Sequence, residues 1–131
     1  MSDALYQAAI KLLILTAVIL APIKAAMFTV GFLIFLDLGT GVWAAKKRKE
    51  SISSAALRRT VSKMVIYQMA LISGFLIEQY LVEGSLPIAK VVAGFIGIVE
   101  FKSVLENSNV ILGTNVFKLL IQKLGSKNDN S

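Results

Sequence analysis

The chain of 131 residues contains neither cysteine nor histidine, and each absence excludes a class of chemistry. Without cysteine, the chain forms no disulfide and offers no thiolate to a metal ion. Without histidine, it lacks the commonest general base and the commonest metal ligand. Its serines lie in no nucleophile elbow, and its glycines form no phosphate-binding loop. We therefore expect no enzyme activity, no cofactor and no metal site.

Apolar residues dominate what remains. They make up 56% of the chain, and the mean hydropathy is +0.72, well above that of an ordinary soluble domain. Residues 25–45 run for about 30 Å as a helix, the thickness of a bilayer's hydrocarbon core, with Asp37 as their only charge. The sequence therefore predicts an all-α integral membrane protein with three to four transmembrane helices and a C-terminal amphipathic helix.

We expect a single membrane domain over residues 1–131, because the length leaves no room for a separate soluble unit. Proline and glycine turns divide the chain into apolar stretches. The predicted membrane helices cover residues 4–21, 25–45, 61–82 and 87–107, followed by an amphipathic helix over 110–124 and a solvated tail over 125–131.

The first of these stretches is the least regular, since Lys11 interrupts it and Pro22 ends it. We predict that it spans the membrane as a short helix. Alternatively, it lies along the membrane surface or is a cleaved signal peptide. A single kinked helix over 12–45 is less favourable, because it would carry Lys24 to mid-bilayer depth at a cost of about 3 kcal/mol.

Cations gather between residues 46 and 59, which we call the basic segment. It holds six of the 14 basic residues and one acid, Glu50. The six are Lys46, Lys47, Arg48, Lys49, Arg58 and Arg59. Cationic loops remain on the cytoplasmic side of a membrane, and this one lacks aromatic partners for nucleic-acid bases. We predict that it anchors the chain to inner-leaflet lipids and binds no nucleic acid, that the C-terminus lies on the same cytoplasmic side, and that the 83–87 turn lies outside.

Asp37 is a candidate functional residue, because a carboxylate inside a membrane span is costly. It opens the sequence DLGTG, in which Thr40 and Gly41 lie on its side of the helix. Small residues here allow another helix to approach closely. We predict a contact between helices or part of a pore wall. A compatible alternative is an ion pair with one of three cations, Arg58, Arg59 or Lys63.

The fourth stretch places small and ionisable residues on one half of its helix. They are Lys90, Gly94, Gly97, Glu100, Ser103 and Asn107. We assign the other half to lipid, with Val92, Ile96, Val99 and, near the inner end, Lys102 and Glu106. Such a stripe is typical of a helix interface or a wet lumen. The alternative is close packing, with Glu100 paired to a cation such as Lys63.

These motifs, in this order, resemble those of phage holins, in the group that includes clostridial toxin-secretion proteins. DLGTG at 37–41 is followed by the cations, by ISS at 52–54, by LRRTVSKM at 57–64 and by EFKSVLEN at 100–107. The resemblance covers about residues 25 to 124. It implies a multi-pass protein of the bacterial inner membrane that self-associates and permeabilises the membrane, releasing an endolysin to the cell wall.

We therefore predict a holin that acts as a homo-oligomer, with membrane lipids and an endolysin as its other partners. The candidates for helix-interface or pore-lining roles are Asp37, Thr40, Gly41, Gly94, Gly97, Glu100, Ser103 and Asn107. Two alternatives remain: a non-lytic membrane scaffold or accessory protein, and a small transport-related protein. No internal repeat supports the transporter.

Overall fold

The computed structural model describes residues 2–126, which form five α-helices, one short 3₁₀ turn and no strand. The helices are α1 (Asp3–Leu20), α2 (Lys24–Lys47), α3 (Ser54–Tyr80), α4 (Ile88–Leu112) and α5 (Val116–Ser126), and the 3₁₀ turn η1 (Ala21–Ile23) joins α1 to α2. Two continuous helical stretches, Asp3–Lys47 and Ser54–Tyr80, are long and apolar enough to cross a membrane. The all-α membrane fold is as predicted.

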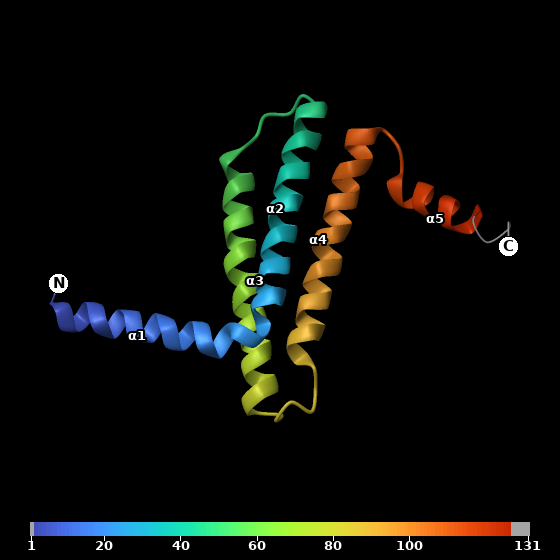
Figure 1. The fold of residues 1–131 in the computed structure, drawn as a ribbon. Helices are drawn as coiled ribbons and strands as arrows, with labels where there is room; N and C mark the ends of the chain where they lie inside the picture. Colours follow the sequence, from blue (N-terminus) through green and yellow to red (C-terminus); the bar gives the residue numbers. More distant parts are fainter. Residues whose placement is uncertain (1, 127–131) are drawn as a thin grey trace.

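Helices α2, α3 and α4 lie side by side and alternate in direction along the chain (Figure 1). Each is about 36 to 40 Å long, enough to cross a bilayer. Between them lies an apolar core whose side chains are almost fully buried. Its centre consists of Val30 and Ile34 of α2 and Leu71 of α3, none of them more than 1% exposed.

Two helix ends differ from the expected bounds. α3 begins at Ser54 rather than at 61, because Ser53 caps it by accepting a hydrogen bond from the backbone N–H of Ala56. α4 continues past residue 107 to Leu112, where Gly113 ends it with a left-handed backbone (φ 67°). Residues 127–131 of the predicted tail lie outside the described part of the chain.

α1 stands apart from the bundle. It leaves crosswise to α2 at the η1 turn (Figure 1), has no buried residue, and extends away from α3 and α4. Pro22 sits within η1, where its fixed backbone suits the tight turn. A crosswise helix agrees with the alternative in which the first stretch lies along the membrane surface.

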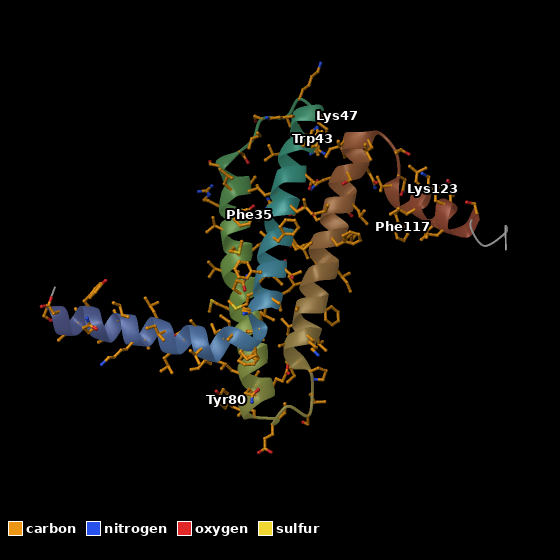
Figure 2. The ribbon with its side chains drawn as sticks, in the orientation of Figure 1. Phe35, Trp43, Lys47, Tyr80, Phe117 and Lys123 are labelled. Carbon is orange, nitrogen blue, oxygen red and sulfur yellow. The ribbon has the colours of Figure 1, made fainter. Side chains whose placement is uncertain are left out.

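α5 leaves the bundle at the end that carries the basic segment. Figure 2 shows its Phe117 and Lys123 well away from the three packed helices, whereas Lys47 and Tyr80 lie at opposite ends of the bundle. Asn115 caps α5 by accepting a hydrogen bond from the N–H of Lys118. The apolar residues of α5 share one face, and all of them except the half-buried Val116 are exposed.

Candidate functional site

One lysine joins all three helices of the bundle. The Nζ of Lys63 in α3 lies 2.8 Å from Oδ2 of Asp37 in α2 and 3.1 Å from Oε2 of Glu100 in α4. Of the cations weighed for Asp37, Lys63 is the one in contact, and the same lysine pairs with Glu100. We call this arrangement the Lys63 bridge.

Asn107 completes the arrangement from α4. Its Nδ2 donates to Oδ1 of Asp37 and to Oγ1 of Thr40, each at 3.2 Å. Gly41 lies beside this contact: a methyl group added there would lie 3.5 Å from Nδ2 of Asn107, an ordinary van der Waals distance. The DLGTG sequence thus supplies the carboxylate and a hydroxyl acceptor for a donor from the neighbouring helix.

Glu100 is fully buried, with 0% of its surface exposed. Its Oε2 accepts from Lys63, but its Oε1 has no hydrogen-bond partner among residues 2–126. Two carboxylates therefore share one ammonium in the interior of the bundle. Burial of ionised groups is costly unless they are paired, so the geometry of this contact is tightly constrained.

The predicted stripe on α4 is divided by the structure. Gly97, Glu100, Ser103 and Asn107 lie toward α2 and α3, whereas Lys90 and Gly94 are exposed, and nothing lies within 4 Å of a methyl group added at Gly94. The assignment of Ile96 and Val92 to the lipid half is wrong. Ile96 is 8% exposed and both pack in the core. The reason is helical phase: Ile96 lies only about 40° from Glu100 around the helix.

An ion pair remains on the outward surface of α4. Lys102 Nζ lies 3.6 Å from Oε1 of Glu106, and their side chains are 76% and 64% exposed. Their predicted position on the lipid-facing half of α4 does not by itself explain the pair. Their spacing of four, within an apolar stretch, was the available signal.

The basic segment lies at the same end of the bundle as the Lys63 bridge. Lys47 donates to the backbone oxygen of Ile111 and so ties the end of α2 to the end of α4. Arg48 pairs with Glu50 at 3.0 Å on the surface. Lys46, Lys49, Arg58 and Arg59 are exposed and form no ion pair within the described chain.

A polar cavity of about 410 Å³ lies between the three helices at this end. Its walls include Arg59 and Thr60 of α3, and Ser103 of α4. Asp37 and Lys63 line it as well, so it extends from the basic segment inward to the Lys63 bridge.

The far end of the bundle has a polar contact between two helices that no sequence pattern indicated. Oε2 of Glu78 accepts a hydrogen bond at 2.8 Å from the N–H of Ala89, in the first turn of α4. Glu78 thereby satisfies a free backbone donor at the start of a helix. Nearby, Gly74 lets α4 approach: a methyl group there would lie 3.3 Å from Val92.

Comparison with known proteins gives one match. The sequence pattern of the bacteriophage holin family matches residues 14–128, which is most of the chain. No curated protein and no solved structure matches significantly.

Proposed function

The chain belongs to the bacteriophage holin family, whose role is to permeabilise membranes, and from that premise we propose that it assembles with copies of itself in the inner membrane of a host bacterium. The assembly opens the membrane and gives an endolysin access to the cell wall. The family is not one of enzymes, and the chain's part in lysis is the physical one of breaching a barrier.

The observation that carries the proposal is the Lys102–Glu106 pair on the outside of α4. Charges facing lipid within a span are costly, and such residues normally face other protein or water. In a single chain the core is filled by Ile34 and Leu71, so a lumen has to form between chains. Association along α4 would remove the ion pair from lipid and give the lumen a polar wall.

We further propose that α2, α3 and α4 span the membrane and that α1 lies along its outer surface. α2 and α3 have the length and apolar composition for this. α4 is as long but carries four charged residues, Lys90, Glu100, Lys102 and Glu106. Lys102 and Glu106 pair with each other on its outward surface, and Glu100 pairs with Lys63. The basic segment and α5 then lie on the cytoplasmic side.

The inner leaflet is the proposed lipid partner. Exposed cations of the basic segment attract anionic head groups, each with about 1 kcal/mol near the surface. α5 adds an exposed apolar face with Lys118 and Lys123 beside it, a pattern typical of helices that lie in a membrane interface.

Controlled expression in bacteria, with a membrane-potential dye and culture density as readouts, tests this function. We expect abrupt depolarisation and arrested growth, followed by lysis only when an endolysin is co-expressed. Lys102→Leu with Glu106→Leu should insert normally but fail to depolarise, with Val99→Leu as the control on the same helix. Steady growth at high expression of inserted wild-type protein would instead favour a non-lytic scaffold.

Topology has its own test, because the chain has no native cysteine. Ser53→Cys lies beside the basic segment and Ser85→Cys lies in the turn at the far end of the bundle. An impermeant thiol reagent added to intact cells should label Ser85→Cys and leave Ser53→Cys unlabelled. Labelling of Ser53→Cys alone would reverse the proposed orientation.

A further inference from the structure

The polar cavity differs in kind from the rest of the bundle interior. Its walls carry hydroxyl, amide and charged groups, including Thr60, Ser103 and Asn107, whereas the interior beyond the Lys63 bridge is apolar. Thr60 and Asn107 donate to protein oxygens, but lipid tails offer no partner to the remaining hydrogen-bonding groups of the lining. Water satisfies them, and about 410 Å³ holds roughly a dozen molecules at about 30 Å³ each.

Beyond the Lys63 bridge the interior changes abruptly. Ile34 and Leu71 are 1% and 0% exposed and close the space between the helices. Glu100 lies at the boundary, fully buried, with Oε2 on Lys63 and an unpartnered Oε1.

We propose that each protomer contains an aqueous half-channel, which admits water and small hydrophilic solutes from the basic-segment side as far as Lys63 and no further. The Lys63 bridge and the apolar core beyond it form the closed end. The half-channel lies inside one protomer and is distinct from the lumen between protomers described above. The inference rests on the proposed membrane topology only in taking α2, α3 and α4 as spans.

Thiol chemistry tests the half-channel, because a thiol reacts as the thiolate, which forms in water and hardly at all in lipid. Thr60→Cys and Ser103→Cys place small side chains on opposite walls of the cavity without altering the Lys63 bridge. Each has a lipid-facing control two or fewer residues away, Val61→Cys and Phe101→Cys, which are more exposed on the isolated chain. If labelling depends only on exposure at the outer surface, the two controls should react faster than the cavity cysteines. If water fills the cavity, the cavity cysteines should react faster.

The reagent is a small cationic methanethiosulfonate, added separately to each side of vesicles that contain the full chain. Ser53→Cys and Ser85→Cys report which side is which. We expect Thr60→Cys and Ser103→Cys to react at least on the order of tenfold faster than their controls, from the Ser53 side only. Leu71→Cys, beyond the bridge, should remain unreactive from both sides.

Three outcomes would overturn the proposal. Reaction of both cavity cysteines no faster than their controls would mean that the cavity is dry. Equal reaction from both sides, or rapid labelling of Leu71→Cys, would mean that water passes beyond the Lys63 bridge. Rates are normalised to protein that resists carbonate extraction, and the two cavity positions serve as independent variants. Because labelling needs no permeabilising activity, its result stands whether or not the chain depolarises cells.

Discussion

The two ends of the bundle are built from the same three helices but are held together by different forces. Near the basic segment, which we call the polar half, the contacts are those of Asp37, Lys63, Glu100 and Asn107. In the apolar half, toward the α3–α4 turn, they are those of Val30, Ile34, Leu71, Phe75 and Ala89. Apart from the contact of Glu78 with the N–H of Ala89, the apolar half packs without charged groups, whereas the polar half requires one arrangement of ionised groups.

This difference shows how a small membrane bundle can hold its helices together and also fix their alignment. Apolar packing holds helices together but distinguishes poorly between neighbouring alignments, since lipid and protein are equally apolar. A lysine that has to meet carboxylates on two other helices permits one alignment. We expect the polar half to determine which fold forms and the apolar half to determine how firmly it is held.

Lys63→Met should disrupt the polar half most, because it leaves the carboxylates of Asp37 and Glu100 without their shared ammonium partner. Removal of one member of a buried ion pair costs about 3–5 kcal/mol, so we expect the largest loss of unfolding free energy here. Reversible unfolding in bicelles measures it. Lys63→Met combined with Asp37→Asn and Glu100→Gln removes the stranded charges and should recover most of the loss. A triple variant as unstable as Lys63→Met would mean that packing of the lysine stem, and not charge, was lost.

In the apolar half, Leu71→Ala should cost about 3 kcal/mol, because it leaves a cavity in a filled core. The same unfolding measurement applies, and Leu81→Ala, at a residue 76% exposed, is the matched control. A loss for Leu81→Ala as large as that for Leu71→Ala would mean that burial in the core is not the cause.

Gly74→Leu tests the close approach of α4 in the apolar half. The added side chain meets Val92 and Ile88, and overpacking of this kind costs about 1–3 kcal/mol. Gly94→Leu adds the same bulk on the exposed side of α4, where nothing is near, and should leave the stability of the protomer unchanged. Equal losses would place Gly94 in a packed contact after all.

The smallest effect is expected for Asp37→Asn. Lys63 keeps Glu100 as its partner, and the change removes the carboxylate in excess, so we expect a loss below about 1 kcal/mol. Glu100→Gln gives the comparison, since it acts at a residue that is completely buried. A loss for Asp37→Asn as large as that for Lys63→Met would mean that all three groups act as one unit.

The sequence predicted the helical membrane fold and the presence of costly charges, because length, hydropathy and isolated carboxylates are local signals. It also contained the Lys63 pairings among its alternatives. The face of α4 was the main error: α2, α3 and α4 are apolar nearly all round, so periodicity hardly distinguishes core from lipid. The role of Glu78 and the crosswise exit of α1 depend on neighbours far along the chain, which no local pattern indicates.

The exits of α1 and α5 have a consequence for the bilayer itself. These two helices leave the bundle at opposite ends, and α2, which runs between those ends, is about 36 Å long. If α1 and α5 lie in opposite membrane interfaces, the protein has a fixed hydrophobic length and fits best in a bilayer of the same thickness. A membrane that is thinner or thicker must then bend toward the protein or tilt it, at a fraction of a kcal/mol per Å of mismatch. Copies in one membrane share that deformation, which draws them together before any side chains meet.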